Sequence, residues 1–141
     1  MTHARKTIRD DVVTTLTGLT TTGSRVHDTR IFPLSESGLP CLAVYAGDEN
    51  VERAALGNML ERQLELVVRC YARATSGVED VLDQIAEEVE TALTSATGAK
   101  DLVLRSSEPE YSDEGDMQIA TRSIVFDVTY YTDAGAPGTP L

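Results

Sequence analysis

The sequence predicts a single α+β domain with two main helices packed on one face of a mainly antiparallel or mixed sheet. Residues 62–73 and 118–132 alternate between apolar and polar side chains, as strands with one buried face do. Residues 78–93 repeat apolar side chains at helical spacing, which gives a helix one apolar stripe. Because each such surface needs a covering partner, we expect the helices and strands to pack together.

The strand over residues 62–73 and the helix after it are the most clearly patterned part of the chain. The inferred core-facing side of the strand consists of Leu64, Leu66, Val68, Cys70 and Ala72. The inferred outer side consists of Gln63, Glu65, Arg69, Tyr71 and Arg73. Ser76 and Glu79 then form a capping box, in which each side chain accepts a hydrogen bond from the other residue's backbone amide. The helix stripe consists of Val78, Val81, Leu82, Ile85, Val89 and Leu93.

An N-terminal helix is predicted over residues 4–19. Gly18 and the threonines after it are expected to end this helix, because glycine costs backbone entropy and threonine is stiff at χ1. The apolar stripe of the helix consists of Ile8, Val12, Val13, Leu16 and Leu19. A basic cluster of Arg5, Lys6 and Arg9 lies in the first turns, where the helix dipole disfavours cations. This cluster is either a solvated face or a contact surface.

Short strands and connections are predicted between the first helix and residue 62. Turn-rich residues 24–38 leave room for short strands over residues 25–27 and 30–34. Residues 40–46 are apolar at both parities, which is typical of a strand that is central or covered on both sides. The acidic residues 47–57 are expected to form a connection, either mobile or with a helical turn.

The last third of the chain is predicted to be mainly strand. Residues 101–105 form a short strand, and Pro109 restricts the residues around it to a sheet edge or a bulge. Residues 112–116 form an acidic turn before the long strand over residues 118–132. The core side of that strand consists of Ile124, Phe126, Val128 and Tyr130. The tail over residues 133–141 is expected to be disordered, which leaves residues 1–132 as the folded domain.

Composition narrows the class of protein. The 141 residues fit one domain, and a formal net charge of −11 opposes non-specific adhesion to nucleic acid. Cys41 and Cys70 lie in apolar strand-like runs, so we expect buried, reduced thiols in a protein made in a reducing cytoplasm. The sequence contains neither a signal peptide nor a segment long enough to span a bilayer, so we expect a soluble protein.

Candidate catalytic side chains are few. The histidines are His3, near the N-terminus, and His27. His27 and Cys41 are residue types that form thiol–base pairs, but their spacing in the sequence does not favour such a pair. The sequence has no glycine-rich phosphate loop and no metal-ligand pattern, so we expect no cofactor and no metal. Glu87 and Glu88 are expected on the exposed outer face of a helix. These patterns indicate a binding or structural protein rather than an enzyme, with a small α+β hydrolase as the alternative from another class.

Several local runs occur in an order that resembles one family of structural proteins. Residues 39–45 read Leu-Pro-Cys-Leu-Ala-Val-Tyr, and the other matching runs are the N-terminal helix and residues 26–30, 64–68, 78–83 and 128–130. In this order the chain resembles, over residues 4–132, the tail terminator proteins of long-tailed bacteriophages, the minor tail protein U family. Residues 47–57 and the tail past residue 132 match no part of the family pattern.

The resemblance implies a non-catalytic protein that caps the finished tail tube as a hexameric ring, ends tube polymerisation and presents the head-joining surface. It implies as partners other copies of the chain, the tail tube protein and a head-completion or connector protein. Phage DNA would pass through the lumen without sequence-specific binding, and no membrane is involved. The protein would lie at the head-proximal end of the virion tail after assembly in the bacterial host cytoplasm. The alternative is another phage connector, either a head–tail completion protein or a tail tube subunit.

Charge patterning supplies candidate interface residues for such a ring. Chains with a net charge of −11 repel one another unless basic groups lie opposite carboxylates. The strand at residues 101–105 is also expected to expose an edge that can pair with a neighbour. The candidate subunit or tube interface residues are Arg5, Lys6, Arg9, Arg25, Arg30, Glu65, Arg69 and Arg73.

Overall fold

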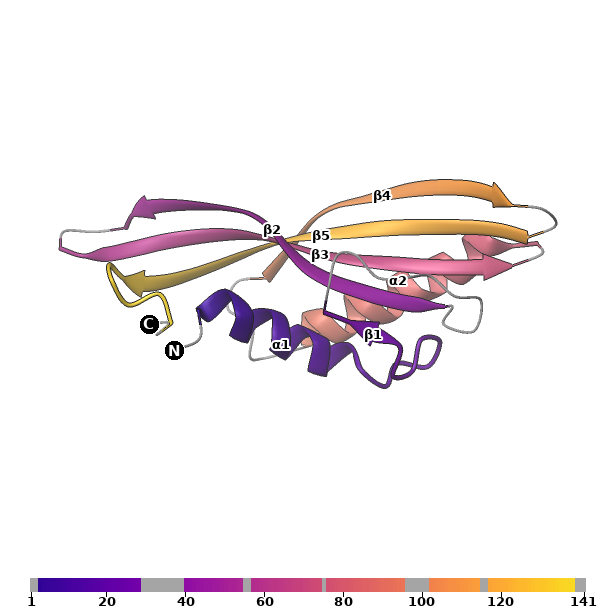
Figure 1. Ribbon diagram of the computed structural model, residues 1–141, viewed down its shortest axis with the longest axis horizontal. Coiled ribbons are helices and arrows are strands. Elements are labelled where there is room, and N and C mark those ends of the chain that lie inside the picture. The colour runs from indigo at the N-terminus through magenta and orange to yellow at the C-terminus, as the bar shows by residue number, and fades with distance from the viewer. Residues whose placement is uncertain are drawn as a thin grey trace.

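The two helices lie on one face of a single five-stranded sheet (Figure 1). A computed structural model describes residues 3–28, 40–54, 57–74, 76–95, 102–114 and 117–138. Its elements are α1 (Ala4–Leu16), β1 (Val26–His27), β2 (Cys41–Arg53), β3 (Met59–Ala74), α2 (Val78–Ser95), β4 (Leu102–Glu114) and β5 (Met117–Asp133). The strand order is β1-β2-β3-β5-β4, with β1 parallel to β2 and the other pairs antiparallel. The predicted α+β fold with a mixed sheet is therefore confirmed.

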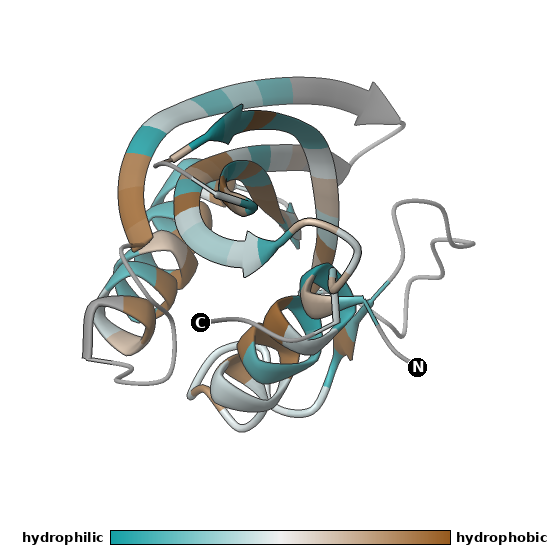
Figure 2. Ribbon diagram, turned by 90° about the vertical axis from the view of Figure 1, so that its left-hand side faces the viewer, coloured by the Kyte–Doolittle hydropathy of each residue, from teal (hydrophilic) through white to brown (hydrophobic). Residues whose placement is uncertain are grey.

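The core lies between the helices and the inner face of β2, β3 and β5. β3 and β5 pair from Met59 opposite Asp133 to Ala74 opposite Gln118, which makes them the spine of the sheet. The residues predicted to face the core from both strands are at most 2 % exposed. The helices contribute Val12, Leu16, Val78, Leu82, Ile85, Val89 and Leu93 to the same cluster. Figure 2, which looks along the molecule, shows the sheet curving over the two helices.

The first helix ends at Leu16, earlier than the predicted residue 19. The Thr17 hydroxyl donates to the Val13 carbonyl at 2.6 Å, and the Thr17 backbone is extended. Gly18 then takes a φ of 98°, a left-handed conformation that turns the chain out of the helix. Leu19 still packs against the core, so its position in the apolar stripe correctly predicted burial but not helix.

Residues 47–53 form a strand, so the prediction of an acidic connection here is wrong. β2 continues to Arg53 and stays paired with β3, with one register shift between Ala46 and Glu49. Figure 1 shows this β2–β3 hairpin, with the end of β5, extending past α1. We call residues 47–53 and their β3 partners the arm. The arm lacks an alternating apolar face, so its strand structure depends on pairing with β3 that no local pattern indicates.

β4 is the outermost strand on its side of the sheet, as Pro109 predicts. The strand is longer than the predicted residues 101–105 and has a register shift between Leu104 and Ser106. Residues 112–114, predicted to turn, belong to this strand instead. The strand predicted near residues 30–34 lies outside the described residues.

The start of α2 differs in detail from the predicted capping box. Gly77, with a φ of 70°, accepts from the backbone amides of Asp80 and Val81 at 3.1 and 3.4 Å. The first turn therefore closes on Gly77, one residue after the predicted cap at Ser76. Glu79 and Asp80 lie in this first turn, where carboxylates complement the helix dipole.

The two ends of the described chain lie close together. The Ala4 amide donates to the Pro137 carbonyl at 2.9 Å, and the Ala134 amide donates to the Asn58 carbonyl at 2.7 Å. The segment after β5 thus contacts both α1 and the turn of the arm. Disorder of the whole tail from residue 133 stays a prediction, and its last described residue is Gly138.

Candidate assembly surfaces

A nearly buried polar cluster lies where the arm meets α1. Its centre is the Glu49 carboxylate, whose side chain is 5 % exposed. Glu49 Oε1 lies 2.9 Å from Arg62 Nη1 and 3.0 Å from Arg5 Nη1, and the Tyr130 hydroxyl donates to Oε2 at 2.5 Å. Arg62 Nε also donates to the Thr132 hydroxyl at 2.9 Å. The cluster therefore joins β2, β3, β5 and the start of α1 through one carboxylate.

Burial shifts the pKa of Tyr130 in this cluster and of His3 beside it. Burial, and then the hydrogen bond to Glu49, raise the pKa of Tyr130. Burial, and then the neighbouring Arg5 charge, lower the pKa of His3, whose Nδ1 accepts from the Arg5 amide at 3.0 Å. His3 therefore serves as a neutral cap of α1. The cluster fixes the position of the arm and offers no nucleophile.

A second set of charges covers the outer face of the sheet, the face away from the helices. Arg69 lies 2.7 Å from Glu110, and Arg105 lies 3.2 Å from Glu65 and 3.0 Å from Asp127. These ion pairs connect β3, β4 and β5 on the outer face of the sheet. Their side chains range from 27 % to 73 % exposed, so solvent screens these pairs and each contributes little to stability.

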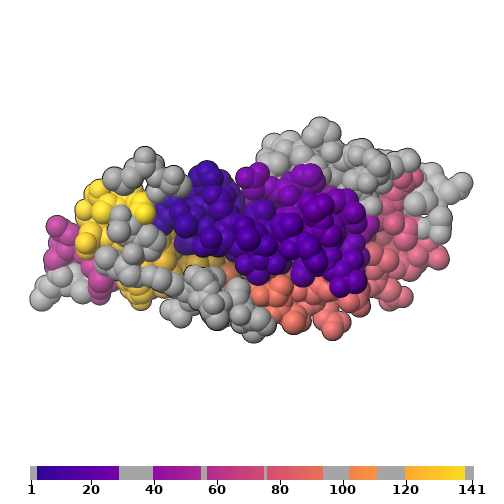
Figure 3. Space-filling view, turned by 90° about the horizontal axis from the view of Figure 1, so that it is seen from below, coloured from indigo at the N-terminus to yellow at the C-terminus, as the bar shows by residue number. Residues whose placement is uncertain are grey.

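The predicted interface residues lie on opposite faces of the sheet. Those on the helix side belong to α1, and Figure 3 shows α1 and the segment after it forming a band across that face. They are Arg5, Lys6 and Arg9. Those on the outer side belong to β3 and are Glu65, Arg69 and Arg73. Arg30 lies outside the described residues. The two described groups are separated by the sheet, so a single contact patch cannot include both.

Besides Arg5, Glu65 and Arg69, two more of the predicted interface residues make contacts within the chain. Arg25 donates to the Pro40 carbonyl at 2.7 Å and to the Thr21 carbonyl at 3.1 Å, which ties the loop after α1 to the start of β2. Lys6 pairs with Asp10 at 2.7 Å, one turn further along α1. Arg25 is therefore better explained as a loop support than as a contact residue.

Glu88 is not the exposed outer-face carboxylate that the sequence predicts. Its two oxygens accept from the Thr21 amide at 2.9 Å and the Thr21 hydroxyl at 2.6 Å, and Gln84 donates to it at 2.9 Å. Burial acts to raise the pKa of Glu88, but these hydrogen bonds outweigh it and hold the pKa below its usual value. Glu88 thus holds the loop after α1 against α2.

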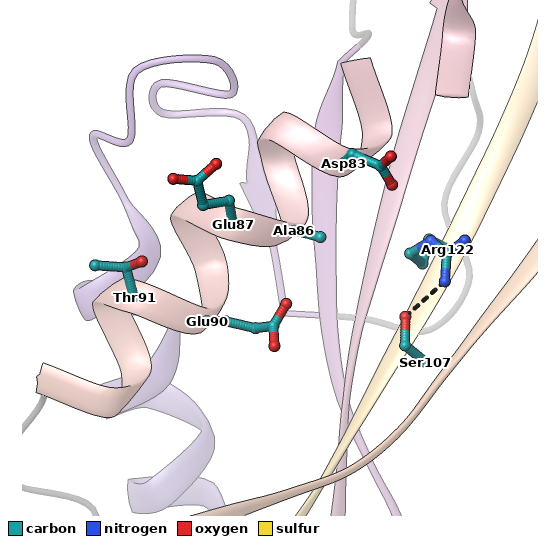
Figure 4. A pocket seen from close by; sticks show the side chains of 7 residues that line it. All are labelled: Asp83, Ala86, Glu87, Glu90, Thr91, Ser107 and Arg122. Carbon is teal, nitrogen blue, oxygen red and sulfur yellow. Dashed lines mark hydrogen bonds between the residues drawn. The ribbon is translucent and has the colours of Figure 1, made fainter. Parts of the chain in front are cut away.

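An open groove of about 490 Å³ runs between α2 and the β4–β5 pair (Figure 4). Arg122 on β5 faces the helix across the groove and donates to the Ser107 hydroxyl at 2.8 Å. The remaining lining residues, all from α2, are Asp83, Ala86, Glu87, Glu90 and Thr91. The groove is thus an acidic surface with one guanidinium, and its lining contains no histidine or cysteine to act as base or nucleophile.

The thiol chemistry that a hydrolase needs is not supported by the described residues. Cys41 and Cys70 are free and fully buried, as predicted. Burial raises the pKa of Cys41 to about 11 and that of Cys70 to about 12. Both thiols are therefore protonated at neutral pH, whereas a nucleophilic cysteine needs a lowered pKa.

The described part of the chain contains neither a metal-binding cluster nor a membrane-spanning helix. No group of three or more His, Cys, Asp or Glu side chains is placed to hold a metal ion there. Neither of its helices is long and apolar enough to cross a membrane.

The Glu49–Arg62 pair is not evident from the sequence. The alternation in β3 does predict that Arg62 faces the core, because Arg62 has the same parity as Leu64 and Leu66. A charged side chain facing the core needs a partner. No such pattern identifies its partner, because Glu49 lies in a stretch without an apolar alternation. The register of β2 against β3, which places Glu49 opposite Leu64, is what brings the pair together.

The sequence profile of a family described as phage minor tail protein U matches residues 3–130. The chain belongs to this family. The chain is accordingly a phage tail component with a structural role, as the sequence resemblance led us to expect. Among solved structures, a chain of the "Virion of native gene transfer agent (GTA) particle" is 15 % identical to this family member, with a TM-score of 0.47. The match covers 90 % of this chain and 95 % of that chain. No curated protein matches the sequence.

Proposed function

We propose that this minor tail protein U family member is a tail terminator. It caps the finished tail tube as a hexameric ring, ends tube polymerisation and provides the surface to which the head joins. The observation that carries this proposal is the family match over residues 3–130, which includes both helices and nearly all of the sheet. The buried, protonated thiols argue against one alternative, a hydrolase with a cysteine nucleophile.

The proposed partners are those that this role requires. Copies of the chain contact one another in the ring, one ring surface contacts the tail tube protein, and another contacts a head-completion or connector protein. Phage DNA passes through the lumen, and the net charge of −11 per copy would oppose its adhesion. The ring would lie at the head-proximal end of the tail after assembly in the host cytoplasm.

The outer sheet face is the proposed subunit or tube contact. Arg69 and Arg73 lie on this face of β3, and the Arg69–Glu110 pair is partly exposed, with the two side chains 27 % and 73 % exposed. An exposed ion pair contributes little, so Arg69 can exchange Glu110 for a carboxylate of a neighbouring protein at small cost. Because charges separated by more than about 8–10 Å are screened at physiological salt, assembly should depend on ionic strength.

Reversing both arginines tests this face. Tails made with the Arg69→Glu/Arg73→Glu variant should fail to end at normal length or to join heads. The matched control adds Glu110→Arg, which restores an ion pair within the chain while keeping residue 69 reversed. If the control rescues assembly, the defect came from the internal pair and this face is not the contact.

Removal of the gene tests the function and separates the alternatives. A phage that lacks a terminator should make tails that exceed their normal length and carry no heads. Loss of a tail tube subunit would instead abolish tails, and loss of a head–tail completion protein would leave tails of normal length without heads. Either of these last two outcomes would replace the terminator assignment.

A further inference from the structure

The described sheet has two open edges, one on β2 and one on β4. β1 pairs only with Leu42 and Ala43, so residues 44–53 of β2 have no outer neighbour among the described strands. β4 is the outermost strand at the opposite side of the sheet. Edge strands present unpaired backbone amides and carbonyls, which readily pair with another chain. The β2 edge was not foreseen from the sequence, because the pattern of residues 47–53 predicts a connection.

The exposed large hydrophobic side chains of the described residues lie on these same two strands. Val103 and Leu104 on β4 are 61 % and 45 % exposed, and Val51 on β2 is 46 % exposed. Single exposed apolar residues are common on protein surfaces. Their restriction to the two open edges is more specific, since a strand docked at either edge would lie beside them.

Each edge also carries features that restrict which strand can pair with it. A register shift lies between Ala46 and Glu49 on β2, and another lies between Leu104 and Ser106 on β4. Bulges of this kind prevent an edge strand from pairing along its whole length with any other strand. They leave a regular run at residues 49–53, which contains Val51, and another at residues 102–104.

The two runs carry groups that can pair with each other, although Arg53 is also exposed at the end of β2. Asp48 and Glu52 are exposed on β2, near Val51. On β4, Arg105 follows Leu104, and its side chain is 51 % exposed. Arg105 already pairs with Glu65 and Asp127 within the chain, but these pairs are partly exposed. Arg105 can therefore exchange them at small cost for Asp48 and Glu52 of a neighbouring copy.

We propose that the β4 edge of one copy docks against the β2 edge of the next copy, through residues 102–104 and residues 49–53. The two edges belong to one chain but differ from each other, so the contact is head-to-tail. Repeated contacts of this kind close into a ring when the rotation between copies allows it. Pairing of β4 with β4 would instead stop at a dimer and leave both β2 edges open. The inference rests on the proposed ring, since a cyclic ring requires a head-to-tail contact.

Disulfide trapping between two full-length variants tests this docking. Val51→Cys and Leu104→Cys are prepared separately, mixed and oxidised, and cross-linked chains are identified by mass. Both positions are exposed and lie on the same face of the sheet, because Val51 pairs with Arg62 and Leu104 pairs with Phe126. The native thiols are buried, so the introduced cysteines are the reactive ones. The mixture should give at least about tenfold more mixed-chain dimer than a control mixture in which Gln63→Cys replaces Val51→Cys. Gln63 is exposed and lies on β3 in the arm, so the control keeps a reactive thiol close to the edge.

Two results would overturn the proposal. One is a mixed-chain yield no greater than that of the Gln63→Cys control. The other is a dominant Leu104→Cys homodimer, which would show β4 pairing with β4. Neither result bears on the deletion phenotype of the phage. If the deletion gives overlong, headless tails but the mixed disulfide does not form, the edge contact is rejected and the terminator role is kept. If the mixed disulfide forms but the deletion gives another phenotype, the edge contact is kept and the terminator role is rejected.

Discussion

Arg62 on β3 lies 2.9 Å from Glu49 on β2, and the two side chains are only 12 % and 5 % exposed. This pair connects the arm to the body of the domain, because Glu49 also binds Arg5 of α1 and Tyr130 of β5. A buried ion pair adds little net stability compared with apolar side chains, yet removal of one partner leaves the other charge buried and unpaired. The position of the arm, and with it the β2 edge, therefore depends on this carboxylate.

We expect Glu49→Gln to lower the free energy of unfolding by about 3–5 kcal/mol, the range for breaking a buried ion pair. Chemical denaturation followed by circular dichroism measures the change. Glu52→Gln, on the exposed part of the same strand, is the matched control and should shift stability by no more than about 0.5 kcal/mol. Equal effects of the two substitutions would show that Glu49 does not hold the arm.

The inner face of β3 gives a second stability prediction. Leu66 is fully buried, so Leu66→Asp places an unpaired charge in the core and should destabilise the domain by roughly 4 kcal/mol or more. Gln63→Asp makes a carboxylate at an exposed position of the same strand and should be nearly neutral. Thermal denaturation of both variants compares them directly. A normal melting temperature for Leu66→Asp would contradict the assignment of strand faces.

The two cysteines should react slowly with a thiol reagent in the native protein. Burial raises the pKa of Cys41 to about 11, so the thiolate fraction at pH 8 falls roughly a hundredfold below that of a thiol with the reference pKa of 9.0. Cys70, with a pKa of about 12, should react more slowly still. Labelling with and without denaturant, read by mass, measures both rates. Native labelling as fast as in denaturant, or a native disulfide, would refute the prediction.

Glu88 should give the domain a measurable sensitivity to acid. Its pKa in the folded protein is below the unfolded reference of 4.5, so its stabilising hydrogen bonds with Thr21 are complete above that value. The contribution is lost as the pH falls through the folded-state pKa. The stability difference between wild type and Glu88→Gln should therefore be constant near pH 7 and shrink below about pH 4.5.

Urea titrations at pH 7 and pH 3 measure the Glu88 effect. Glu87→Gln serves as the control, because Glu87 is exposed on the preceding position of α2 and should show no such trend. A Glu88→Gln difference that stays the same at both pH values would mean that the Thr21 contact does not depend on the carboxylate charge.

The secondary structure and the buried face of a segment could be predicted from the sequence alone where its apolar residues repeat at a regular spacing. The alternation in β3 and β5 predicted the buried core-facing side chains, and the helical stripe predicted the face of α2 that packs on the sheet. The alternation missed Tyr71, which was assigned to the outer side of β3 but is buried beside Cys41 and Ala43. The predictions of the core face succeed because apolar burial dominates where a segment has one covered face. Pro109 likewise placed β4 at an edge, since proline lacks the donor that an inner strand needs.

Features that depend on distant partners could not be assigned in this way. Residues 47–53 form a strand because they pair with β3, although they have no alternating apolar face. Glu88 has the local sequence of a solvated carboxylate, and only the placement of the loop carrying Thr21 against α2 gives it partners. The candidate interface residues were chosen by charge sign alone, which gives no information about the two faces of a sheet. Register and loop placement, rather than composition, decided these cases.

The terminator assignment requires that copies of this chain form one ring at the end of each finished tail. Electron microscopy of purified tails, with the chain marked by a bound antibody fragment, tests this requirement. We expect label at the head-proximal end only, as a single ring with six copies per tail. Label distributed along the tube, or absent from tail ends, would contradict the assignment.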